Sequence, residues 1–183
     1  MVVTIGVIAD THIPDRVRWL NPRVLEIFHD RQVDVILHAG DVSAPYVLKE
    51  LEEIAPVHAV RGNRDWLLLS RLPKTLNLEF AGISIGLAHG HGGLKNYLAD
   101  RLYLLIHDYS HEMLLPRLLE TFPNSRVIVF GHGHVPLNSW MDGKLLFNPG
   151  SPHFPHTKRI APSLGILLLS TGGEVKGQII PLD

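Results

Sequence analysis

Five times in this chain, a short apolar run ends directly before residues that bind metals. Such runs, rich in Val and Ile, are typical of strands buried on both faces. In α/β sheets, ligands bind just beyond the carboxyl ends of the strands. The pattern therefore predicts one site, built at a common edge from segments remote in sequence. The polar segments are Asp10-Thr11-His12, Gly40-Asp41, Gly62-Asn63-Arg64-Asp65, His89-Gly90-His91 and Gly131-His132-Gly133-His134.

The first third of the chain alternates expected strands with expected helices. Asn21-Pro22 offers a helix cap followed by a proline at the first helical position. Ser43 is the expected cap of a second helix that begins near Pro45. This β-α-β-α-β order is typical of a parallel sheet with crossover helices. The strands are expected at residues 2–9, 33–38 and 57–61.

The rest of the chain favours antiparallel pairing. Asp142-Gly143 and Gly172-Gly173 each predict a two-residue hairpin turn. A helical stretch is expected over 95–121, broken near Pro116. The economical architecture is a single α/β domain over 1–183, with two packed mixed β-sheets flanked by helices in a four-layer αββα sandwich. The further strands are expected at 75–80, 83–88, 126–130, 137–141, 144–147, 164–170 and 174–180, and a long loop at 149–162.

Composition excludes several classes of protein. The chain has 183 residues, of which 45% are apolar, enough for one large core. Its 17 basic and 18 acidic residues argue against an extended nucleic-acid surface, which needs a basic excess. No cysteine is present, so thiolate metal sites are excluded. No secretion signal or transmembrane run is visible, which favours a cytoplasmic protein without membrane contact. A homodimer is plausible, although no feature demands one.

The candidate ligands point to hydrolysis at phosphorus. Oxygen and imidazole donors without sulfur suit Mn, Fe, Co, Ni or Zn. Seven such residues exceed the needs of one ion. If one carboxylate bridges, they can hold two ions about 3.5–4 Å apart. Such a pair stabilises both the attacking and the leaving oxygen of an in-line displacement at phosphorus. It also lowers the pKa of a bridging water, so that hydroxide is available near neutral pH. The seven are Asp10, His12, Asp41, Asn63, His89, His132 and His134.

The ordered motifs DxH, GD, GNxD, H and GHxH resemble those of the calcineurin-like metallophosphoesterase superfamily. The length and the sequence Asn148-Pro149-Gly150-Ser151 resemble its small single-domain phosphodiesterase branch. The resemblance implies a two-sheet sandwich and a metal-dependent phosphodiesterase acting on a small phosphodiester or nucleotide-type substrate. Manganese is the expected metal, with Fe, Ni, Co or Zn as alternatives. It also implies that Asp10, His12 and His134 bind the first ion, that Asn63, His89 and His132 bind the second, and that Asp41 bridges both.

One position departs from the family pattern. Arg64 stands where the family usually places a histidine that meets the phosphate and protonates the leaving group. Arginine keeps its proton, so it cannot be an ordinary acid, but it can donate paired hydrogen bonds to phosphate. We predict charge stabilisation by Arg64, the alternative being a surface ion pair with Asp65. His91 is a candidate substitute acid or phosphate contact, or else a solvated turn residue. The predicted catalytic residues are Asp41, Asn63, Arg64, Asp65 and His91.

Other polar residues have weaker assignments. His38, within a buried strand, is expected to be a hydrogen-bonded core histidine. Asn148 is expected to pin the loop after it through backbone hydrogen bonds. The stretch 95–121 is a lid, a packing helix or a subunit contact. His107 and His111 have metal-binding spacing on it but no third ligand nearby, so an ordinary role is favoured. The loop residues that could line a substrate mouth are His153, His156 and Arg159.

Two readings from other classes compete with the enzyme. One is a non-catalytic protein-interaction scaffold on the same fold, like the retromer subunit that resembles this fold and has lost part of its metal set. The other is a mononuclear metal-binding or metal-sensing module. The intact ligand set disfavours the scaffold, and a single ion would leave Asn63 and one or two histidines without a role.

Overall fold

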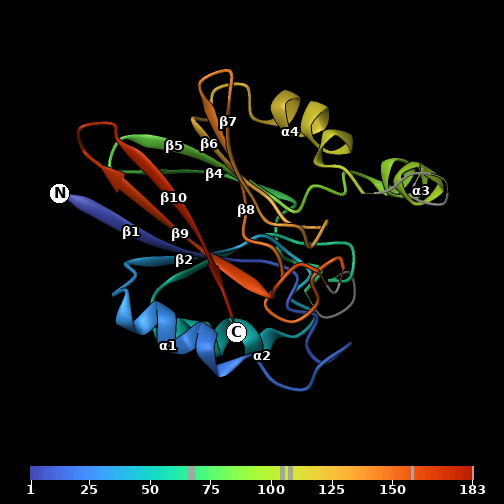
Figure 1. The fold of residues 1–183 in the computed structure, drawn as a ribbon, viewed down its shortest axis with the longest axis horizontal. Helices are drawn as coiled ribbons and strands as arrows, with labels where there is room; N and C mark the ends of the chain where they lie inside the picture. Colours follow the sequence, from blue (N-terminus) through green and yellow to red (C-terminus); the bar gives the residue numbers. More distant parts are fainter. Residues whose placement is uncertain (66–68, 104–105, 107–108, 158, 183) are drawn as a thin grey trace.

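The strands form two five-stranded sheets that pack face to face (Figure 1). The computed structural model describes residues 1–65, 69–103, 106, 109–157 and 159–182. The first sheet has the order β10-β9-β1-β2-β3, and the second has the order β4-β5-β6-β8-β7. The first contains β1 (Val2–Ile8), β2 (Val35–His38), β3 (Val57–Ala59), β9 (Ser163–Ser170) and β10 (Val175–Pro181). The second contains β4 (Thr75–Phe80), β5 (Ile83–Ala88), β6 (Val127–Val129), β7 (Leu137–Met141) and β8 (Lys144–Asn148).

Each sheet has a parallel centre and antiparallel additions. β1, β2 and β3 run parallel, as do β5, β6 and β8. The hairpins β4–β5, β7–β8 and β9–β10 are antiparallel. The mixed sheets and the hairpins expected from the turn residues are therefore confirmed. The strands at 75–80, 83–88 and 137–141 match the expected ranges, and the others differ from them by one or two residues at their ends.

Burial on both faces explains the continuous apolar runs. Ile5 and Val7 of β1 face the other sheet, whereas Ile8 packs toward the helices on the outer side. Because successive side chains alternate between the two faces of a strand, a strand buried on both faces is apolar along almost its whole length. The four-layer arrangement expected from sequence is confirmed.

Helices cover the outer face of each sheet (Figure 1). α1 (Pro22–Asp30) and α2 (Pro45–Glu52) pack on the first sheet, and α4 (Leu115–Thr121) packs on the second. α3 (Leu94–Tyr103) lies at the periphery, beside α4, and a short 3-10 turn, η1 (His111–Met113), precedes α4. None of the helices in the described parts of the chain is long and apolar enough to cross a membrane.

The helices match some of the expected features and depart from others. The side chain of Asn21 caps α1 as expected, accepting from the Arg23 amide at 3.1 Å. The expected capping role of Ser43 is wrong: α2 is preceded by Ala44, and the Ser43 hydroxyl instead donates to Asp15 at 3.1 Å. The stretch 95–121 divides into α3, η1 and α4, and α4 begins beside Pro116, where a proline is tolerated.

Candidate metal centre

The loops after the parallel strands of both sheets meet at one edge. The amide of Asp10, which follows β1, donates to the Gly40 carbonyl after β2 at 2.9 Å. The amide of His132, which follows β6, donates to the carboxylate of Asp10 at 2.9 Å. The amide of Gly131 donates to the His89 carbonyl at 3.2 Å, which joins the loops after β6 and β5. The bond between His132 and Asp10 joins segments that are 122 residues apart in sequence.

The backbone at the candidate ligands is strained. Five of the seven have positive φ angles, a conformation that costs a non-glycine residue of the order of 1 kcal/mol or more. Strain of this kind persists where the surrounding structure enforces it, and it clusters at functional sites. The five are Asp10 (56°), His12 (52°), Asp41 (54°), His132 (73°) and His134 (54°).

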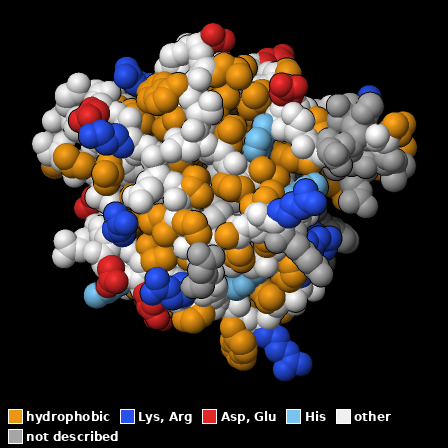
Figure 2. Space-filling model, in the orientation of Figure 1, with side chains coloured by type: hydrophobic (Ala, Val, Ile, Leu, Met, Phe, Trp, Pro, Cys, Tyr) orange, Lys and Arg blue, Asp and Glu red, His pale blue; other side chains and the backbone are white. Residues whose placement is uncertain are grey.

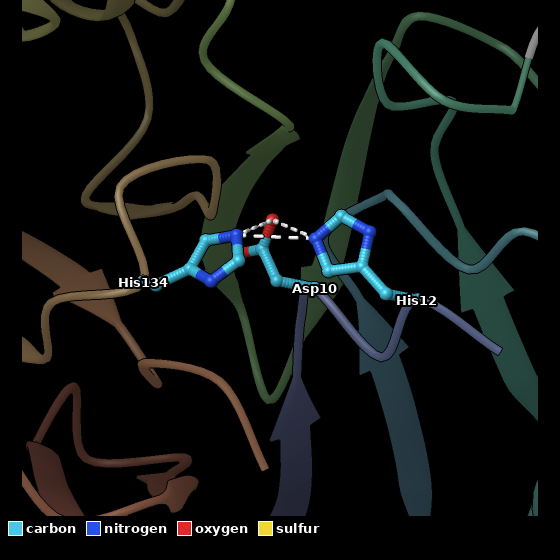
Figure 3. Close-up of side chains that lie close together, drawn as sticks. All are labelled: Asp10, His12 and His134. Carbon is cyan, nitrogen blue, oxygen red and sulfur yellow. Dashed lines mark hydrogen bonds and ion pairs between the residues drawn. The ribbon is translucent and has the colours of Figure 1, made fainter. Parts of the chain in front are cut away.

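The residues expected to hold the first ion converge (Figure 3). Nε2 of His12 lies 3.1 Å from Nε2 of His134, and Oδ1 of Asp10 lies 3.4 Å and 3.9 Å from Nε2 of His134 and His12. Nδ1 of His134 donates to the Phe154 carbonyl, which leaves a lone pair on Nε2. Oδ1 of Asp10 is buried and has no hydrogen-bond partner among the described residues. An orphaned carboxylate oxygen facing two imidazoles is suited to a cation.

The residues expected to hold the second ion also converge. Oδ1 of Asn63 lies 3.0 Å from both Nε2 of His89 and Nδ1 of His132. Nδ1 of His89 donates to the Ala39 carbonyl at 2.8 Å, so the Nε2 lone pair faces Asn63. Two acceptor atoms pointed at each other repel unless a cation or a proton lies between them. This set therefore also suits a metal ion.

Asp41 lies between the two sets. Its Oδ1 is 3.6 Å from Nε2 of His89, and its Oδ2 is 3.7 Å from Nε2 of His12. The Arg64 amide donates to Oδ1 at 2.8 Å and fixes the carboxylate. Each oxygen of Asp41 thus faces a histidine of a different set, the geometry that a bridging carboxylate requires.

Burial and neighbouring charges set the protonation of the metal-free site. Burial lowers the pKa of His12 and His132 to about 3, so both rings are neutral at pH 7. Burial alone would lower the pKa of His89 and His134 as well, but the carboxylates of Asp41 and Asp10 outweigh it and raise both values. Burial also raises the pKa of Asp41 to about 6. Neutral imidazoles and carboxylates are the forms that bind metals.

A cavity of about 270 Å³ opens over these residues. Its walls include Asp41, Asn63 and Arg64 from the expected site. Tyr97 and Tyr109 belong to the stretch 95–121, which therefore borders the cavity, although the sequence pattern singled out neither tyrosine. The lining residues that the pattern did not indicate are Arg16, Tyr97, Asp100, Tyr109, Phe154 and Pro155.

Comparison with known proteins identifies the family. The calcineurin-like phosphoesterase superfamily domain matches residues 3–172. The chain belongs to this superfamily. A probable metallophosphoesterase of Methanothermobacter thermautotrophicus is 34% identical over 176 residues, which cover 96% of this chain and 91% of that protein. A phosphodiesterase of Methanocaldococcus jannaschii is 25% identical over 159 residues, covering 80% and 82%.

A solved structure shares the fold of this chain. A Vps29 single mutant from Entamoeba histolytica superposes with a TM-score of 0.71 at 22% identity, covering 99% of this chain and all of the other. Membership of the family supports the function of a metal-dependent phosphoester hydrolase. The converging ligand atoms supply groups that can hold a metal.

Arg64 and Asp65, the two residues after Asn63, have different surroundings. Arg64 borders the cavity, and its Nη1 lies 3.6 Å from Oδ2 of Asp15, with both side chains partly exposed. The alternative ion pair between Arg64 and Asp65 is wrong, because Asp65 is buried and accepts from the amides of Ser43 (2.7 Å) and Gly62 (2.8 Å). Asp65 thus ties the loop after β3 to the loop after β2.

The remaining histidines divide between cavity and core. His91 borders a neighbouring cavity, with its ring centroid 5.2 Å from that of His89. His156 lines the cavity over the ligands, whereas His153 accepts from the Asn21 amide at 3.2 Å. His38 is fully buried and accepts from the Gly40 amide at 3.2 Å, as expected of a core histidine.

Three further expectations concern the loops. Asn148 donates to the Gly131 carbonyl and accepts from the Gly150 amide, both at 2.9 Å, which confirms that it pins the loop. His111 is paired with the Tyr109 hydroxyl at 3.1 Å, and its expected companion His107 lies outside the described residues. Arg159 is exposed and is not among the residues that border the cavity.

Proposed function

We propose that this protein is a two-metal phosphodiesterase. The observation that carries the proposal is the position of Asp41, whose two oxygens lie 3.6 Å and 3.7 Å from histidines of the two ligand sets. A site for one ion needs no such carboxylate between two sets. The proposed ligands are Asp10, His12 and His134 for one ion, Asn63, His89 and His132 for the other, and Asp41 for both.

The chain's own residues position the substrate. Two divalent ions, with Mn²⁺ the expected metal, would neutralise phosphate charge and supply hydroxide near neutral pH. Arg64 reaches the cavity with a guanidinium that can donate two hydrogen bonds to phosphate oxygens. The Asp65 carboxylate accepts from the Gly62 amide, which holds the turn that carries Asn63 and Arg64, and from the Ser43 amide, which ties this turn to the loop after β2. The phosphate thus meets positive charge on the Arg64 side as well as at the metal centre.

Four observations favour a small diester over a monoester or a polynucleotide. One relative is named as a phosphodiesterase. Arg64 cannot protonate a leaving group, so the site suits esters whose leaving group departs without that help. The cavity of about 270 Å³ accepts a small ester. On the face shown in Figure 2, the basic side chains stand singly or in small groups rather than in the continuous band that a polynucleotide would require.

The test is metal-dependent turnover. Chelator-treated protein is assayed with bis-p-nitrophenyl phosphate and with p-nitrophenyl phosphate after adding Mn²⁺, Ni²⁺, Co²⁺, Zn²⁺ or Mg²⁺. We expect metal-dependent hydrolysis with faster turnover of the diester, and its loss in Asp41→Asn. Asp142→Asn makes the same chemical change in the exposed β7–β8 turn and should keep full activity.

Failure of this assay has a specific meaning. Tight metal binding without turnover on either ester would contradict the proposal and favour a protein-interaction scaffold or a metal sensor. Faster turnover of the monoester would retain the phosphoesterase and overturn the diester preference.

A further inference from the structure

A second cavity, of about 630 Å³, lies beside the metal centre. It shares Asn63, Arg64 and Tyr97 with the smaller cavity over the ligands, so the two spaces meet at these three residues. Its volume is in the range of small-molecule sites. The proposed hydrolysis of a phosphate at the metal centre leaves this space without a role.

The second cavity is basic although the chain is nearly neutral. Arg61, Arg64 and Lys74 line it, and no Asp or Glu belongs to the described part of its wall. One nitrogen of Arg61 donates to the Ser70 carbonyl at 2.9 Å, which orients the guanidinium without neutralising it. Neither Arg61 nor Lys74 takes part in an ion pair among the described residues. Three positively charged side chains that line one cavity attract an anion.

The backbone adds to this potential. Gly92 and Gly93 also line the cavity, and α3 begins at the next residue, Leu94. The amino end of a helix carries partial positive charge and free amide groups that bind phosphates. No acidic residue lies in the first turn of α3 to cancel it. Gly92 has a positive φ of 68° and no side chain to block a ligand.

We propose that the second cavity binds a second phosphate of the substrate, separate from the one at the metal centre. The inference rests on the proposed function and narrows it to nucleotide-type esters that carry an additional phosphate. Arg64, at the junction, would lie between the two phosphates. Arg61, Lys74 and the α3 terminus would bind the distal phosphate, and Tyr97 offers an aromatic face beside both.

The test uses two substrates that differ by one phosphate. Both are thymidine 5′-(p-nitrophenyl phosphate) esters, with and without a 3′-phosphate, so the scissile group is the same. We expect kcat/KM to be about tenfold higher for the 3′-phosphorylated ester, mostly through a lower KM, which corresponds to about 1.4 kcal/mol. Lys74→Gln and Arg61→Gln should each remove much of this preference, measured as the ratio of kcat/KM for the two esters with the same variant. Lys49→Gln, at an exposed position of α2, is the matched control and should retain the preference for the 3′-phosphorylated ester.

A binding measurement separates this inference from the proposed function. Calorimetry on chelator-treated protein compares thymidine 3′,5′-bisphosphate with thymidine 5′-phosphate, and we expect tighter binding of the bisphosphate that Lys74→Gln weakens. If neither ester is hydrolysed but the binding difference remains, the proposed function fails and the second site stands. If both esters are hydrolysed at equal kcat/KM, or if both nucleotides bind equally, the second phosphate site is wrong.

Discussion

Asp65 offers the sharpest prediction about how the loops hold the metal centre. Its carboxylate is 1% exposed and accepts from the amides of Ser43 at 2.7 Å and Gly62 at 2.8 Å. Each hydrogen bond to a charged acceptor contributes about 1.5–3 kcal/mol, so Asp65→Ala should cost about 3–6 kcal/mol of the free energy of unfolding. That is a large share of the roughly 5–15 kcal/mol that stabilises a typical domain. Asp65→Asn keeps one accepting oxygen and should cost about half as much.

The assay is urea unfolding of the metal-free variants, followed by circular dichroism, with Mn²⁺ affinity measured in parallel. Ser43 follows Asp41 by two residues and Gly62 directly precedes Asn63, so the two hydrogen bonds hold the backbone beside two candidate ligands. We therefore expect Mn²⁺ affinity to fall by about 10- to 100-fold, as when groups that orient ligands are removed. Asp30→Ala, at the exposed end of α1, is the control and should change stability by less than about 0.5 kcal/mol. A loss below about 1 kcal/mol in Asp65→Ala, with unchanged Mn²⁺ affinity, would refute this reasoning.

Two further predictions concern protons. The metal-free protein should lose stability as the pH falls from 6.5 to 5, because four histidines whose pKa burial lowers stay neutral when folded and take up protons near pH 6.5 when unfolded. They are His12, His38, His91 and His132, with pKa values of about 3, 4, 3 and 3. Asp41, whose pKa burial raises to about 6, opposes this trend. His89 and His134, whose pKa values are raised by the carboxylates of Asp41 and Asp10, gain their stabilising protons mainly above this pH range. Calorimetry should show a lower Tm at pH 5, and an equal or higher Tm would contradict the argument. Separately, Arg64→His introduces a side chain that can protonate the leaving group. It should speed hydrolysis of diphenyl phosphate, which has the poorer leaving group, by about tenfold relative to bis-p-nitrophenyl phosphate. An unchanged ratio of the two rates would count against charge stabilisation without proton donation by Arg64.

The strands and the ligand positions could be predicted because local patterns encode them. A strand buried on both faces is apolar along almost its whole length. The apolar runs before Asp10, Asp41 and His132 therefore mark where three such strands begin and end. Hairpin turns such as Asp142-Gly143 need residues that tolerate positive φ, and both residues have it here (48° and 76°). The parallel strands then carry the following polar residues to one edge.

Contacts between distant segments could not be predicted in the same way. Ser43 has the residue type of a helix cap, but Asp15 and Asp65 offer its hydroxyl and its amide stronger partners. Arg64 pairs with Asp15 rather than with its neighbour Asp65 for the same reason. Tyr109 reaches the cavity from a segment whose apolar composition says nothing of where it packs. Each outcome depends on tertiary neighbours that no local pattern specifies.

The central claim is that the strand ends of two sheets build one site for two ions. Anomalous diffraction from crystals of the protein grown with Mn²⁺ tests it most directly. We predict two anomalous peaks about 3.5–4 Å apart, with the Asp41 carboxylate between them. One peak should lie beside His12 and His134, and the other beside His89 and His132. A single peak at full occupancy, or two peaks that Asp41 does not join, would contradict the account.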